Sequence, residues 1–279
     1  MTKPSLTAAV VIAASMLAAG TARGQGRLVD DEAVLAPLRA RVAAGYGVAW
    51  LTFPGPGQSA YAIGGTGVNA EGAIGLSRGL EVGVRFGLRL DDAGRGLRAD
   101  EVARGFETAT YGTGLSTIAN PELRLRWRVV QWRWLEAGLD ERFVFPTSSA
   151  PDVTQILGAW LSTHAPGVAR ADVGIDGVLS WQKFATGYQL LPAFGMPVRI
   201  WVNPTRGLFA GAIVTSRYYA STPYTTDYVQ VTTGVVVGYR VGPCDASLGA
   251  YLLDVVNSGS DRRGIGVDLA CRFGRQPHR

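Results

Sequence analysis

Long apolar runs are missing from the sequence beyond its first 22 residues, so no later stretch has the roughly 20 apolar residues of a membrane-spanning helix. The exception, Leu6–Ala19, has fourteen residues, follows Lys3 and precedes the small residues 20–22. This order predicts a signal peptide over residues 1–22, and therefore an exported protein; a buried helix is the alternative. An exported chain that enters a membrane without such helices must do so as a β-barrel, because only helices and closed barrels satisfy every backbone polar group in lipid.

Histidine and cysteine are also scarce, with two of each. Neither His164 nor His278 has a serine and an acid at a spacing typical of a catalytic triad, so we expect no enzyme activity. Two cysteines and two scattered histidines cannot supply a zinc site, and we predict no metal and no cofactor. Asp91, Asp92 and Asp227 lack the spacing of a calcium-binding loop and are better explained as solvated loop acids.

The basic pI of about 9.4 suggests an acidic partner at first, but long Lys/Arg runs interleaved with aromatic residues are missing. Nucleic acid is therefore not an expected partner, all the more so for an exported chain. The 37 glycines and 14 prolines indicate many strands and turns.

The stretch Leu28–Ala43 is the one part of the exported chain with a helical pattern. Asp30 can cap it and Glu32 suits its first turn, while Pro37 should shorten or kink it. We expect residues 23–45 to form an N-terminal periplasmic segment with a short helix; a plug inside a barrel lumen is the alternative.

Beyond Gly45 the pattern is of strands only, without a linker or a change of composition, which predicts one all-β domain over residues 46–273 and a tail over 274–279. The twelve predicted strands cover about 46–53, 69–77, 80–90, 122–130, 133–145, 153–164, 168–178, 188–202, 207–217, 228–241, 244–255 and 263–273.

The connections between these strands alternate in length. Those after the even-numbered strands are short, such as APG and GP, and those after the odd-numbered strands are mostly long. This alternation is typical of a transmembrane antiparallel up-and-down β-barrel with short periplasmic turns and long outer loops. The longest loop, from Asp91 to Asn120, contains a predicted helix capped by Asp100 and has the length to cover the barrel mouth.

Successive residues within the strands alternate between apolar and polar. In LEVGVRFGLRL (Leu80–Leu90) the even positions are all apolar, and the odd positions are Glu, Gly and Arg. Side chains of a strand point alternately to its two faces. The polar faces are rich in glycine, which suits a crowded barrel interior better than an exposed sheet, and aromatic residues gather near strand ends as in an interfacial girdle. We therefore expect the apolar faces to contact lipid.

The predicted lumen face carries charges from adjacent strands. The candidate lumen-lining residues are Glu71, Glu81, Arg85, Arg89, Arg124, Arg126, Arg128, Glu136, Asp140 and Arg142. Over all strands nine arginines stand against eight acids on this face, which is nearly balanced. Arg85, Arg89, Arg124 and Arg126 suggest a weakly anion-attracting wall; a lattice of salt bridges that stiffens the barrel is the alternative.

Charge pairing predicts the register of two hairpins. In the hairpin of residues 122–145, a fold about Gln131–Arg133 brings three pairs of oppositely charged residues together and leaves Arg126 opposite a glycine. The predicted pairs are Arg128–Glu136, Arg126–Gly138, Arg124–Asp140 and Glu122–Arg142. Folding residues 69–90 about Arg78 places Glu71 opposite Arg85.

Cys244 begins one predicted strand and Cys271 nearly ends the next. Folding the last hairpin about Asn257–Ser258 sets them opposite each other, and an exported protein meets an oxidising environment, so a disulfide is plausible. Two unrelated small apolar residues are the alternative.

Taken together, the strand pattern over residues 46–273 resembles the porin-like and transporter-like outer-membrane β-barrels of Gram-negative bacteria. The last strand, GIGVDLACRF, resembles the C-terminal strand by which such barrels are recognised for assembly, although GRQPHR follows its aromatic Phe273. The resemblance implies export to the outer membrane, contact with lipid and lipopolysaccharide, and insertion by the barrel-assembly machinery.

The function that this resemblance implies is passive transport of small polar or amphiphilic solutes. A closed structural or adhesion barrel acting through its outer loops is the alternative, and the shortage of histidine disfavours an outer-membrane hydrolase.

A barrel of this class should migrate faster on a denaturing gel before heating than after it, because the closed sheet resists detergent until it is melted. Identical migration of heated and unheated samples, or solubility without detergent, would contradict the prediction.

Overall fold

The computed structural model describes residues 27–55, 58–89, 121–145, 153–184, 187–220, 227–252, 255–258 and 262–274. The predicted signal peptide and the whole of the long loop from Asp91 to Asn120, with its predicted helix, lie outside these ranges. Within them, no helix is long and apolar enough to cross a membrane.

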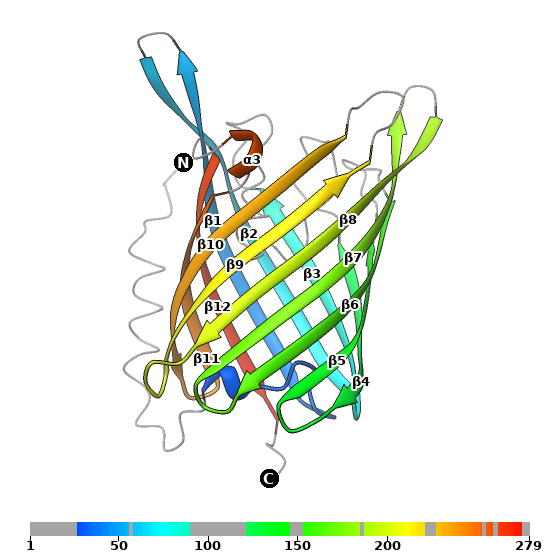
Figure 1. Ribbon diagram of the computed structural model, residues 1–279, viewed down its shortest axis with the longest axis vertical. Coiled ribbons are helices and arrows are strands. Elements are labelled where there is room, and N and C mark those ends of the chain that lie inside the picture. Colours follow the sequence, from blue (N-terminus) through cyan, green and yellow to red (C-terminus); the bar gives the residue numbers. More distant parts are fainter. Residues whose placement is uncertain are drawn as a thin grey trace.

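The twelve predicted strands are confirmed, and they close into one antiparallel barrel in which β1 pairs with β12 (Figure 1). The strands are β1 (Ala40–Gly55), β2 (Gln58–Ser77), β3 (Leu80–Arg89), β4 (Glu122–Gln131), β5 (Leu135–Val144), β6 (Val153–Ala165), β7 (Ala169–Phe184), β8 (Gly187–Val202), β9 (Leu208–Tyr219), β10 (Tyr228–Val241), β11 (Cys244–Leu252) and β12 (Arg262–Phe273). One helical turn, α3 (Val255–Ser258), lies between β11 and β12.

The short turns gather at one end of the barrel, which we call the short-turn end. The turn after β2 uses Gly79 at φ +99°, a conformation that favours glycine. At the opposite end the first hairpin rises beyond its neighbours (Figure 1), because residues predicted as the loop between β1 and β2 continue both strands past a β-bulge at Ala49/Trp50.

Polar side chains line the barrel interior and apolar side chains cover its outside. On β3, Glu81 and Arg85 are buried, whereas Val84 is 59% exposed and Phe86 41% exposed. The face assignment derived from LEVGVRFGLRL therefore has the correct sense: the charged face looks inward.

Inward aromatic rings pack on glycines of the neighbouring strands. A Cβ at Gly238 would lie 2.2 Å from Cζ of Phe209, and one at Gly234 would lie 2.2 Å from Cδ1 of Tyr251. Both rings are buried in the barrel interior. The glycines on the polar face thus leave the space that these rings fill.

The sixteen-residue helical pattern at Leu28–Ala43 does not form a helix of that length. Only Leu28–Asp30 is helical, as one 3-10 turn (η1), and β1 already begins at Ala40, ahead of the predicted barrel boundary at residue 46. The intervening residues run through bends and a turn, and hydrogen bonds to the barrel wall override their local helix propensity.

The predicted register of β4 with β5 is wrong by two residues. Arg126 lies opposite Asp140, and Arg124 lies opposite Arg142. A β-bulge between Arg128 and Val130 shifts the pairing near the turn. Long side chains still reach their diagonal neighbours, so Arg124 pairs with Asp140 without facing it directly.

The substitution Gly238→Val should destabilise the barrel by roughly 1–3 kcal/mol, because the added side chain overlaps the Phe209 ring. The urea concentration that abolishes the fast-migrating gel band measures this. Gly177→Ala is the matched control, since its Cβ would meet nothing closer than the Leu157 carbonyl oxygen at 3.7 Å. Equal midpoints for the two variants would contradict the packing argument.

Candidate functional site

Residues 27–39, here called the lumen segment, lie inside the barrel at its short-turn end. Three backbone N–H groups of the segment donate to side chains from separate parts of the wall. Val29 donates to the Asn203 amide oxygen at 3.0 Å, Ala33 to a Glu136 carboxylate oxygen at 2.9 Å, and Leu35 to a Glu81 carboxylate oxygen at 2.8 Å.

The segment leaves the lumen along β2. Leu38 N–H donates to the Gly75 carbonyl and Gly75 N–H donates to the Arg39 carbonyl, both at 2.9 Å. A Cβ at Gly75 would lie 2.1 Å from the Ala36 carbonyl oxygen, so only glycine permits this close approach.

Apolar residues of the segment are shielded from solvent inside the lumen. Val29 and Val34 are fully buried, and Ala33 and Val34 pack against the inward-facing Trp160 of β6. The guanidinium of Arg126 lies 4.4 Å above the Trp160 ring and donates to the Ala33 carbonyl oxygen at 2.7 Å. The segment therefore has both apolar and polar attachments.

Acidic side chains of the segment bind arginines of the wall. Asp31 accepts from Arg240 at 2.6 and 3.0 Å and forms an ion pair with Arg272 at 2.9 Å. Its backbone carbonyl accepts from Arg170 at 2.8 Å. These contacts come from β10, β12 and β7, so one residue joins three strands of the ring.

Beyond the segment, charged side chains of β4 to β7 form a connected lattice. Arg142 pairs with Asp176 at 2.7 Å and approaches Asp140 to 3.6 Å. Arg142 and Asp176 belong to β5 and β7, and Gly158 lies between them on β6. A Cβ at Gly158 would lie 2.4 Å from the Asp176 carboxylate, so this glycine lets the pair meet across a strand.

A cavity of about 270 Å³ lies between the lumen segment and these walls. Seven arginines and seven acidic residues line it, together with aromatic rings that include Trp160 and Trp201. Its lining combines many charged side chains with apolar ones, and the charges carry no excess of either sign. Among the described residues, no group of three or more His, Cys, Asp or Glu side chains is arranged to hold a metal ion.

The predicted lumen residues divide among different roles. Glu71 pairs with Arg85 at 2.7 Å, in the predicted register, and also with Arg41. Glu81 and Glu136 hold the lumen segment, and Arg128 lies 3.6 Å from both Glu136 and Glu32. Arg89 ends β3, but its side chain lies outside the described residues.

Cys244, Cys271 and His164 are not among the residues that line the cavity. Cys244 and Cys271 are directly opposed and form a disulfide between β11 and β12. His164 lies near the turn after β6, where its N–H donates to the Trp134 carbonyl at 3.0 Å. His278 lies outside the described residues.

The sequence did not reveal which residues of the lumen segment and of the wall contact each other. Asp31, Glu32 and Asn203 were not among the candidates, and neither was Trp160. The run Asp30–Glu32 was the available clue, because it complements the arginines at the short-turn end, but strand alternation says nothing about residues outside strands.

A scan against protein-family models and a search of curated proteins found no match to the sequence. Solved structures match its fold. A NanC porin gives a TM-score of 0.55 at 11% identity, covering 84% of this chain and 100% of that one. A KdgM porin in complex with disordered oligogalacturonate gives 0.53 at 6% identity, covering 84% and 99%. An outer membrane channel from Pseudomonas putida F1 gives 0.54 at 10% identity, covering 88% and 98%.

The class that these observations define is the twelve-stranded antiparallel β-barrel, with the fold of outer-membrane porins. This protein combines that barrel with a folded segment inside the lumen.

A cysteine placed in the lumen segment tests its burial. We expect Val34→Cys to react with a water-soluble maleimide at least about tenfold more slowly than Leu38→Cys in the folded protein, because Val34 is fully buried and Leu38 is 82% exposed. Both should react at the same rate after heat denaturation. Equal rates in the folded protein would contradict the placement of the segment.

Proposed function

We propose that the protein is an outer-membrane channel for small polar solutes and that the lumen segment obstructs its short-turn end. The observation that carries this proposal is the polar cavity enclosed by a closed barrel whose outside is apolar. A polar interior with an apolar exterior suits a wall that separates water from lipid.

The exposed outer face supports a membrane location. Large apolar side chains such as Val84, Trp127, Leu157, Val235 and Leu248 are each at least half exposed, and they come from separate strands around the ring. A water-soluble monomer does not expose apolar side chains on this scale. Export by a signal peptide, contact with lipid and lipopolysaccharide, and insertion by the assembly machinery are parts of the same proposal.

The charges of the cavity support weak ion selectivity. Arg85 is engaged by Glu71, Arg124 by Asp140, and Arg126 by Trp160 and the Ala33 carbonyl. These contacts favour the salt-bridge lattice over an anion-attracting wall, since a selective pore requires an excess of one sign. We therefore propose solutes of either sign, or neutral polar solutes, rather than a strict anion channel.

A closed structural or adhesion barrel is the second candidate, and the lumen segment is the observation that favours it. Backbone and side-chain contacts hold this segment to β2, β3, β5, β10 and β12. A segment that never leaves would make the barrel a scaffold for its outer loops.

Planar-bilayer recording separates the two candidates. Deletion of residues 27–38 should raise the mean current of the purified barrel by roughly tenfold over the full-length protein, because the segment no longer occupies the short-turn end of the lumen. The substitution Arg206→Ala, in the exposed turn after β8, is the control and should leave the current unchanged.

The outcome is decisive only for correctly folded samples, which the heat-dependent gel shift identifies. If the folded deletion variant carries no current above the leak of the bilayer, the channel proposal is overturned and the closed barrel is supported.

A further inference from the structure

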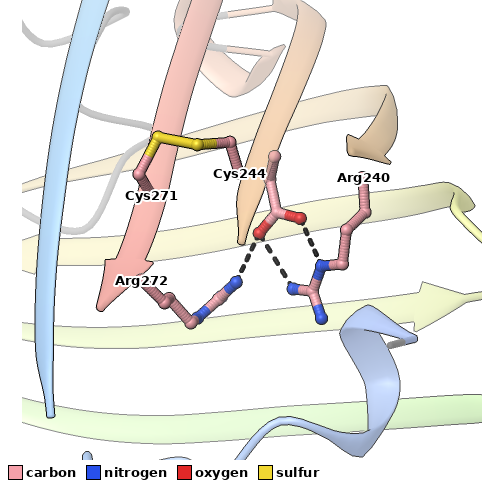
Figure 2. Close-up of a disulfide and its surroundings, with 5 residues drawn as sticks. Arg240, Cys244, Cys271 and Arg272 are labelled. Carbon is pink, nitrogen blue, oxygen red and sulfur yellow. Dashed lines mark hydrogen bonds and ion pairs between the residues drawn. A yellow bond between two sulfur atoms is a disulfide. The ribbon is translucent and has the colours of Figure 1, made fainter. Parts of the chain in front are cut away.

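One carboxylate at the short-turn end organises the arginines that bind the lumen segment. Asp245 accepts from Arg240 at 2.5 and 2.9 Å and from Arg272 at 2.5 Å (Figure 2). Both arginines also bind Asp31 of the lumen segment. Arg240, Asp245 and Arg272 thus form a clamp, and Asp31 is the group that it holds.

Two of the three clamp residues directly follow a disulfide-bonded cysteine. Asp245 follows Cys244 and Arg272 follows Cys271. Neighbouring residues of a strand point to opposite faces, so the cysteines lie on the outer face while Asp245 and Arg272 point into the lumen. The disulfide and two of the clamp side chains, those of Asp245 and Arg272, therefore lie on opposite faces of the same two strands, β11 and β12 (Figure 2).

This part of the wall is where the barrel closes. The end of β12 pairs with the start of β1, with Phe273 opposite Ala40 and Arg272 opposite Arg41. Strand ends near chain termini separate easily when nothing else holds them. The disulfide is the covalent link that holds the end of β12 against β11 at this position.

We propose that the Cys244–Cys271 disulfide is a positioning group for the lumen segment. It keeps Asp245 and Arg272 at the spacing that binds Asp31, and it thereby retains the segment in the lumen. The proposal deepens the proposed function, because the retained segment is the obstruction postulated there.

The binding of Asp31 by the clamp depends strongly on the relative positions of its charged groups. Paired Arg–carboxylate contacts are directional, and a buried arginine that loses its acid carries an uncompensated charge. When a dithiol reductant transfers two electrons and two protons to the disulfide, the S–S bond breaks, two thiols form and the reductant becomes a disulfide. The end of β12 is then held to β11 by non-covalent contacts alone, and Asp31 is released more often.

The test measures exposure of the segment through the cysteine introduced by Val34→Cys. Combining this change with Cys244→Ser and Cys271→Ser should raise its maleimide labelling rate by about threefold or more over the variant with the native disulfide intact. The serines face outward, so their effect on residue 34 must pass through the backbone and the clamp.

Asp31→Asn supplies the coupling test. Alone it should accelerate labelling of residue 34, and adding the two serine changes should then produce little further increase, because both act on the same contact. Glu141→Gln is the matched control on the outer face, where a Glu141 carboxylate oxygen accepts from the Gln155 amide at 2.9 Å, and it should leave the rate unchanged.

Labelling that stays at the original rate in the folded serine variant would overturn the proposal, and so would effects of Asp31→Asn and the serines that multiply independently. If the serine variant fails to assemble, the assembled Val34→Cys barrel is reduced with dithiothreitol, freed of the reductant and labelled, and peptide mapping counts the label on residue 34 separately from that on Cys244 and Cys271. Because labelling needs no ion flow, an absent current in bilayers would reject the channel without touching this proposal.

Discussion

The pairing of β12 with β1 is the interaction on which the rest of the structure depends. Without it the sheet has two edges with unpaired backbone groups, which neither lipid nor a dry interior can satisfy. With it, twelve strands enclose a lumen, and the charges of their inner faces can be arranged around a ring. The lumen segment enters at this junction, since it leads directly into β1.

Much of the barrel was predictable, because strand alternation and turn length are local features. They predicted the twelve strands, the inward face of β3, and the pairing of Glu71 with Arg85. The β4–β5 register was not predictable from charge alone. Arginine side chains span diagonal positions, so the Arg124–Asp140 pair is compatible with more than one register, and the bulge near Val130 leaves no mark in the pattern.

The site was predicted only in part. Glu81 and Glu136 were expected to line a lumen, but their actual partners are backbone N–H groups of residues 35 and 33. The sequence around Leu28–Ala43 favours a helix locally, but the hydrogen bonds that hold it in another conformation come from wall residues 46 to 174 positions away. No local pattern encodes such distant partners.

The lumen segment is covalently continuous with β1, which makes it a tethered ligand of its own barrel. A short tether holds its local concentration near the binding surface in the millimolar range or above. In the proposed channel, a solute that enters the short-turn end would compete with a ligand that cannot diffuse away. Lasting release of the segment would require a second surface that binds it once it has left the lumen.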